Sequence, residues 1–94
     1  MAESPVLVVD DEPAILRALS VALRARGHTV LTATSGTEAL ERCATDDPAA
    51  VILDLGLPDI DGLEVCRRIR AWSEVPIIVL TAEGADERKV AALD

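Results

Sequence analysis

Aromatic residues are almost absent from this chain of 94 residues: Trp72 is the one aromatic, and there is no Phe or Tyr. Half of the residues are nevertheless hydrophobic, so any core must be aliphatic, built from Val, Leu, Ile and Ala. A chain of this length can form one small domain with a modest core. We therefore expect residues 1–94 to form a single domain.

Basic residues are also scarce. The 9 Lys and Arg stand against 17 Asp and Glu, which gives a formal net charge of −8. A nucleic-acid backbone is bound through Lys and Arg that displace counterions, and an anionic membrane surface attracts basic segments. The charge balance argues against both partners for this segment, and it suits a divalent cation or a basic patch on a partner protein.

Cysteines and long apolar runs are the remaining scarcities. Cys43 and Cys66 are too few for a disulfide scaffold and lack metal-ligand spacing. Each falls on the apolar side of a predicted helix, so we expect both to be small buried hydrophobic residues. No signal peptide opens the chain and no apolar run could span a bilayer, so we expect a cytoplasmic location and no membrane partner.

What the sequence does contain is an alternation of short apolar runs with helical patterns, which predicts a parallel sheet with helices on its faces. The predicted strands are Val6–Asp10, Thr29–Ala33, Val51–Asp54 and Ile77–Thr81. The predicted helices begin at Pro13, at Ser35 (where Ser35 and Glu38 have capping-box spacing), at the N-cap Asp61, and at Glu83, the last running to Asp94.

Three of the apolar runs end in polar residues. Val6–Val9 is followed by Asp10 and Asp11, Val51–Leu53 by Asp54, and Ile77–Leu80 by Thr81. In open α/β sheets, ligands bind outside the carboxyl ends of the strands. We therefore expect these polar side chains to converge on one site.

Such a cluster of acids requires a counter-charge. Two carboxylates about 4 Å apart repel by roughly 4 kcal/mol at an effective dielectric constant near 20. Protonation, a Lys or Arg, or a divalent cation would relieve this, and no Lys or Arg flanks these strand ends in the sequence. Oxygen ligands favour Mg²⁺ or Mn²⁺ over zinc. The alternative, that the acids only cap helices and turns, suits Asp11 and Asp61 but explains Asp54 poorly.

A carboxylate beside a bound cation can attack phosphorus and form an acyl phosphate. The cation and nearby hydrogen-bond donors would stabilise charge on the phosphoryl oxygens. Thr81, at the end of its strand, offers a hydroxyl group for this purpose.

Three motifs, in order and at these separations, resemble the receiver domain of bacterial two-component response regulators. They are Val8–Pro13, Asp54–Pro58 with Asp61 and Gly62, and Pro76–Ala82. The resemblance covers essentially the whole chain and is strongest to receivers of the OmpR type. It implies a flavodoxin-like (CheY-like) doubly wound parallel sheet.

The resemblance also implies roles for individual residues. Asp54 would accept a phosphoryl group from a phosphohistidine on a sensor histidine kinase, and Thr81 would hydrogen-bond that group. Asp11 and Asp54 would bind Mg²⁺ directly, Asp10 through water, and Gly56 through its backbone carbonyl. The chain would then be a stoichiometric phosphoacceptor with possible self-dephosphorylation, not an enzyme, and would control a DNA-binding, transcriptional output domain elsewhere in its protein.

The resemblance has one departure. In the family, a fifth strand and fifth helix follow, with an invariant Lys at the end of that strand; Lys89 falls in the predicted fourth helix and is not its equivalent. We therefore expect a C-terminally incomplete receiver with strand order 2-1-3-4. The outer edge of Ile77–Leu80 would then be exposed and would favour a homodimer or a swapped association.

Two other functions remain open. A metal-dependent aspartyl phosphohydrolase of the haloacid-dehalogenase type also places an Asp after its first strand, but needs a second Asp two positions on, where this chain has Glu12. A phosphorylation-incompetent interaction module is disfavoured by the complete set of acids, although the absent Lys leaves it open.

Overall fold

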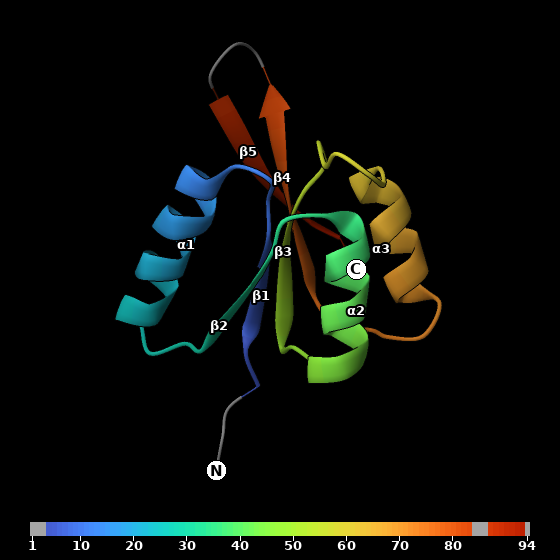
Figure 1. Ribbon diagram of the computed structural model, residues 1–94, viewed down its shortest axis with the longest axis horizontal. Helices are drawn as coiled ribbons and strands as arrows, with labels where there is room; N and C mark the ends of the chain where they lie inside the picture. Colours follow the sequence, from blue (N-terminus) through green and yellow to red (C-terminus); the bar gives the residue numbers. More distant parts are fainter. Residues whose placement is uncertain (1–3, 84–86, 94) are drawn as a thin grey trace.

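The computed structural model of the chain describes residues 4–83 and 87–93, with residues 81–83 and 87–93 described by their backbone alone. The strands are β1 (Val6–Val9), β2 (Val30–Ala33), β3 (Ala50–Asp54), β4 (Ile77–Glu83) and β5 (Glu87–Leu93). The helices are α1 (Pro13–Ala25), α2 (Gly36–Asp46) and α3 (Gly62–Arg70). The strands form one sheet in the order β2-β1-β3-β4-β5 (Figure 1).

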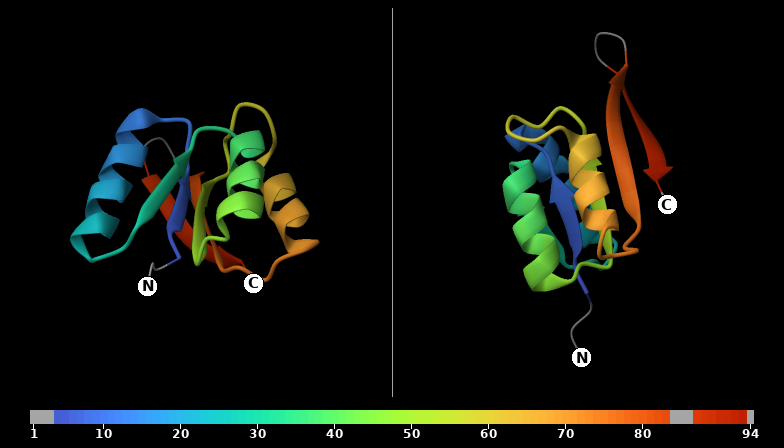
Figure 2. Two further views of the ribbon diagram at one scale, coloured as in Figure 1. Left: turned by 60° about the horizontal axis from the view of Figure 1, so that its bottom comes forward. Right: turned by 90° about the vertical axis from the view of Figure 1, so that its right-hand side faces the viewer.

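The first four strands pair in parallel, as the alternation of strands and helices predicted. Helix α1 covers one face of the sheet, whereas α2 and α3 lie side by side on the other (Figures 1 and 2). The predicted fold class and the order 2-1-3-4 are confirmed.

The strands are apolar on both sides because both faces of the sheet are covered. Successive strand residues point to opposite faces. One set packs with α2 and α3 in the larger core and includes Leu7, Val9, Val51, Leu53, Ile77 and Val79. The other set packs with α1 and includes Val6, Val8, Val30 and Ile52.

The α1 face is less completely buried than the opposite face. Leu16, Leu19 and Leu23 of α1 pack against the sheet but are only partly buried, and Ala22 is exposed. Within the described residues α1 is the one helix on this face (Figure 1). A single helix leaves the apolar side chains at its flanks in partial contact with water.

Two predicted helix caps are present. The Asp61 side chain accepts a hydrogen bond from the Leu63 amide at 3.1 Å, and the Ser35 hydroxyl accepts one from the Glu38 amide at 3.1 Å. The return bond of the capping box differs from the expectation. Glu38 accepts from the amide of Thr34 at 2.8 Å, one residue before the N-cap, so its carboxylate fastens the end of β2 to α2.

The predicted helix over Glu83–Asp94 is wrong for the described residues in this range. Glu83 ends β4, and Glu87–Leu93 forms β5, which pairs antiparallel with β4 from Ile77↔Leu93 to Glu83↔Glu87. A helix here would leave the edge N–H and C=O groups of β4 without strand partners, and the tertiary pairing outweighs the local helical pattern.

The outer edge of Ile77–Leu80, which we expected to be exposed, is therefore covered by the chain itself. Beyond Leu80, β4 pairs with β5 and no longer with β3. The two strands form a hairpin at one side of the molecule (Figure 2). Among the described helices, none is long and apolar enough to cross a membrane.

Candidate metal and phosphoryl site

Asp10, Asp11 and Asp54 lie at the carboxyl ends of two neighbouring strands. β1 and β3 pair in parallel register, with Val9 opposite Leu53. The residues that follow this pair, Asp10 and Asp54, therefore lie together at the carboxyl ends of the two strands. Asp11 is the next residue along from Asp10, before α1 begins at Pro13.

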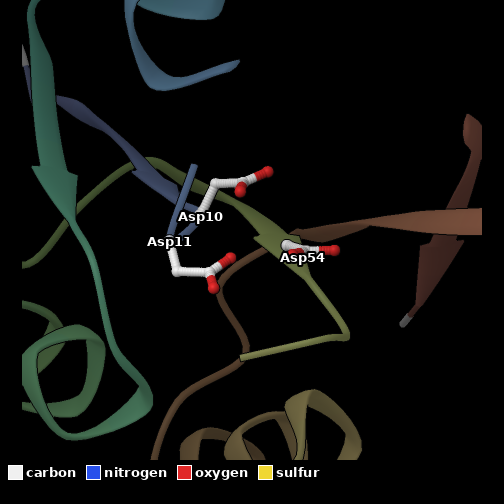
Figure 3. Close-up of side chains that lie close together, drawn as sticks. All are labelled: Asp10, Asp11 and Asp54. Atoms are coloured by element: carbon white, nitrogen blue, oxygen red, sulfur yellow. The ribbon is translucent and has the colours of Figure 1, made fainter. Parts of the chain in front are cut away.

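The three carboxylates converge as the sequence predicted. One carboxylate oxygen from each residue can be chosen so that all three oxygens lie within 4.8 Å of one another. Asp10 is fully buried, Asp54 is only 6% exposed, and Asp11 is exposed to solvent. Figure 3 shows the three side chains gathered around one space at the ends of β1 and β3.

This arrangement is electrostatically demanding. At a separation of 4.8 Å, two ionised carboxylates repel by about 3.5 kcal/mol at an effective dielectric constant near 20. Asp10 has a fixed orientation, because its Oδ1 accepts a hydrogen bond from the Glu12 amide at 2.9 Å. Three converging oxygen donors, one of them open to solvent, fit a hard divalent cation.

The loop after Asp54 returns closely onto the strand end. The Leu55 carbonyl accepts a hydrogen bond from the Gly62 amide at 3.2 Å, which closes the loop where α3 begins. A Cβ on Gly62 would lie 2.6 Å from Leu55 Cα and 2.9 Å from the Asp54 carbonyl oxygen, so this approach requires glycine. Gly56 lies within the loop, where an added Cβ would stand 3.8 Å from Asp54 Oδ2.

Thr81 is placed beside this cluster by its backbone. Asp54 pairs with Leu80, and Thr81 is the next residue of β4. In the antiparallel pairing, Thr81 stands opposite Lys89, which we had assigned to a helix. The side chains of both residues lie outside the described part of the structure, so the predicted hydrogen bond of the Thr81 hydroxyl stays a prediction.

Sequence reasoning missed Asp59. Its carboxylate accepts hydrogen bonds from the Gly36 amide at 2.7 Å, the Thr37 amide at 3.0 Å and the Thr37 hydroxyl at 2.7 Å. The bond from the Thr37 hydroxyl, followed by those from the two amides, holds the pKa of Asp59 well below its usual range. The only signal in the sequence was an Asp two residues before an N-cap, which did not indicate a partner 23 residues earlier.

The cysteines behave as predicted. Both are free and buried. Burial raises the pKa of Cys43 to about 11, and it also raises the pKa of Cys66. Neither thiol is therefore activated as a nucleophile or prepared as a metal ligand.

Residues 6–94 match the family model described as the response regulator receiver domain. The chain belongs to this family. Receiver domains of response regulators are the phosphoacceptor modules of two-component signal transduction, and the family match disfavours the phosphohydrolase alternative.

Curated relatives include transcriptional regulatory proteins and response regulators. The chain is 52% identical to the transcriptional regulatory protein KdpE of Mycobacterium tuberculosis and 49% identical to the KDP operon transcriptional regulatory protein KdpE of Escherichia coli, over 95% of its own length. It is 47% identical to the response regulator MprA of Mycobacterium ulcerans. It spans 39% of the length of the Mycobacterium tuberculosis and Mycobacterium ulcerans relatives and 40% of the length of the Escherichia coli one.

Solved structures share the fold. The chemotaxis response regulator CheY4 of Vibrio cholerae is 32% identical, with a TM-score of 0.83 over 89% of this chain and 72% of that one. The response regulator TrrA of Thermotoga maritima, solved in complex with Mg²⁺–BeF, is 41% identical, with a TM-score of 0.82 over 87% of this chain and 72% of that one.

Proposed function

We propose that the chain accepts a phosphoryl group on Asp54 from the phosphohistidine of a sensor histidine kinase, in a reaction that needs Mg²⁺. The observation that supports this most directly is the convergence of the Asp10, Asp11 and Asp54 carboxylate oxygens within 4.8 Å. Asp54 is the last residue of β3 and is 6% exposed, and Asp11 beside it is open to solvent.

Each residue of the site has a proposed role. An Asp54 oxygen forms a bond to phosphorus as the phosphorus–nitrogen bond of the donor breaks, and the departing imidazole takes up a proton. Asp11 and Asp54 would hold the cation directly, Asp10 would do so through water, and Gly56 would contribute its backbone carbonyl. Mg²⁺, or Mn²⁺ in its place, would neutralise charge on the phosphoryl oxygens. Thr81 donates a hydrogen bond to the phosphoryl group.

The wider setting of the chain is also a proposal. We place residues 1–94 in one receiver domain, whose phosphorylation shifts a conformational equilibrium that an output domain reads. The relatives are transcriptional regulators, so we propose that this output binds DNA and that the protein works in the cytoplasm. The receiver itself is then a stoichiometric phosphoacceptor, which can also dephosphorylate itself.

Labelling with acetyl phosphate tests this function. We expect intact-mass spectrometry to show one added phosphoryl group per chain, only with Mg²⁺ or Mn²⁺ present, and none after addition of EDTA. Asp54→Asn should abolish the label, because the amide cannot form the acyl phosphate. The control Asp47→Asn makes the same chemical change at an exposed position after α2 and should be labelled like the wild type.

Undiminished labelling of Asp54→Asn, or labelling that persists without a divalent cation, would contradict the proposed function. Sustained turnover of p-nitrophenyl phosphate would favour the phosphohydrolase instead, since a phosphoacceptor is consumed once per chain.

A further inference from the structure

The side chain of Asp59 joins the loop between β3 and α3 to α2 through three hydrogen bonds. Its Oδ1 accepts from the Gly36 amide, and its Oδ2 accepts from both the amide and the hydroxyl of Thr37. Both carboxylate oxygens are therefore used. The two amides belong to the first turn of α2, where N–H groups have no partner within the helix.

Asp59 and the N-cap Ser35 accept hydrogen bonds from different backbone N–H groups at the start of α2. The Ser35 hydroxyl accepts from the Glu38 amide, which is a contact within the same segment. Asp59 accepts from Gly36 and Thr37 and so joins two parts of the chain 23 residues apart. Loss of Ser35 would weaken α2 alone, whereas loss of Asp59 would also release the loop.

The packing around this contact leaves little room for the loop to shift. A Cβ on Gly36 would lie 2.9 Å from Ile60 Cβ, 2.9 Å from Val65 Cγ2 and 3.3 Å from Asp59 Oδ1. Glycine at this position lets the loop lie directly against the start of α2. The attraction between a carboxylate and the positive end of a helix strengthens the contact.

The loop held in this way follows the nucleophile Asp54 directly in the chain and contains Gly56. The Gly62 amide donates a hydrogen bond to the Leu55 carbonyl and so joins the two ends of the loop. Between these ends, Asp59 accepts hydrogen bonds from α2. Gly56 lies between Leu55 and Asp59 in the chain. The position of the Gly56 backbone relative to the Asp54 carboxylate thus depends on both sets of hydrogen bonds.

We propose that Asp59 is a positioning residue for phosphoryl transfer: by fastening the loop to α2, it holds Gly56 and Asp54 in the arrangement that binds the divalent cation. This inference rests on the proposed function, because it assumes a cation at the Asp54 cluster. It assigns Asp59 no contact with the cation or with the phosphoryl group.

Magnesium binding to the unphosphorylated chain, measured by titration calorimetry, tests the inference. Loss of residues that orient metal ligands weakens metal affinity by about tenfold or more, so we expect Asp59→Ala to raise the Kd for Mg²⁺ roughly tenfold. Asp59→Asn keeps one acceptor oxygen and should give an intermediate Kd. This partial rescue is not expected if only the charge of Asp59 matters.

Two control variants separate positioning from other effects. Ser35→Ala weakens the same end of α2 without touching the loop, and should lower the melting temperature while leaving the Kd unchanged. Asp61→Asn removes one negative charge from the same loop, and Asn is an equally good N-cap, so its Kd should stay close to that of the wild type.

Three results would overturn the inference: an unchanged Kd in Asp59→Ala, an equal rise in Ser35→Ala, or an equal rise in Asp61→Asn. If Asp59→Ala does not fold, Thr37→Val takes its place, because it removes only the hydrogen bond from the Thr37 hydroxyl to Asp59. Thr37→Val should raise the Kd for Mg²⁺ by a smaller factor. A wild-type Kd in that variant would overturn the inference. A wild-type chain that binds no Mg²⁺ would overturn both proposals, whereas unaltered Mg²⁺ binding in Asp59→Ala with normal Asp54 labelling would overturn this one alone.

Discussion

At the scale of single residues, two glycines shape the backbone around the three carboxylates. Gly62 lets α3 begin against the backbone of Leu55 and the carbonyl of Asp54, and Gly36 lets α2 begin against Ile60. Neither position has the left-handed backbone that usually explains a glycine; each is required for close approach. These glycines let the loop after Asp54 lie close to the start of α2 and to the end of β3, whereas the carboxylates themselves converge because β1 and β3 pair in parallel.

Gly62→Ala tests the importance of this approach. Alanine would normally favour a helix over glycine by about 1 kcal/mol, but here its Cβ must displace backbone atoms of the loop. We expect a net loss of about 1–3 kcal/mol in the free energy of unfolding, measured with urea, together with slower labelling by acetyl phosphate.

Gly27→Ala is the matched comparison for this variant. Gly27 has a φ of +92° with nothing within 4 Å of an added Cβ. Alanine there should cost about 1 kcal/mol through backbone strain, and the labelling rate should not change. A Gly62→Ala chain that matches the wild type in both stability and labelling rate would contradict the role assigned to Gly62.

At the scale of elements, β5 shows how pairing decides conformation. The segment Glu87–Leu93 has residues that a helix would accept, yet it lies along the full length of β4. A seven-residue strand alongside seven-residue β4 supplies ladder hydrogen bonds that β4 would otherwise lack on that side. The same pairing brings Lys89 opposite Thr81, at the end of β4 that extends past Asp54.

Nuclear magnetic resonance of the chain tests this strand directly. We expect cross-strand nuclear Overhauser effects between β4 and β5, in the register that pairs Ile78 with Ala92 and Leu80 with Val90. Medium-range contacts between residues three apart across Glu87–Leu93 would instead show a helix and would contradict the strand.

At the scale of the whole molecule, the sheet is unevenly protected. Two helices cover one face and, among the described residues, one helix covers the other (Figure 1). Strand β5 covers the outer edge of β4. Self-association through that edge, which the sequence suggested, therefore requires β5 to detach first.

Proline substitutions in β5 test this protection. Ladder hydrogen bonds alternate along an antiparallel strand, so at least one of Val90→Pro and Ala91→Pro removes a donor that faces β4. We expect that variant to loosen β5, expose the edge and increase self-association in sedimentation velocity. Val90→Thr keeps the N–H group and should sediment like the wild type. Equal sedimentation of all variants would contradict a protective role for β5.

Much of the fold and of the site was predictable because both arise from local pattern. The apolar runs fixed β1 to β4, and parallel pairing then brought Asp10, Asp11 and Asp54 to one edge. The contact of Asp59 with α2 was not predictable, since it joins residues 23 apart and depends on the curvature of a loop. The partial exposure of the apolar residues of α1 was also not predictable from the sequence. The spacing of apolar residues indicates which face of a helix is apolar, but not how much of that face other elements cover.

The sequence by itself determined the parallel sheet, the helix caps and the acidic strand ends, because each is encoded by residues close together in the chain. Only the tertiary structure decided that Glu87–Leu93 is a strand and that Asp59 joins the loop after Asp54 to α2. Both outcomes depend on backbone groups that have no partner nearby in the chain: the N–H and C=O groups along the outer side of β4, and the first N–H groups of α2. These groups gain hydrogen-bond partners only when distant segments of the chain come together.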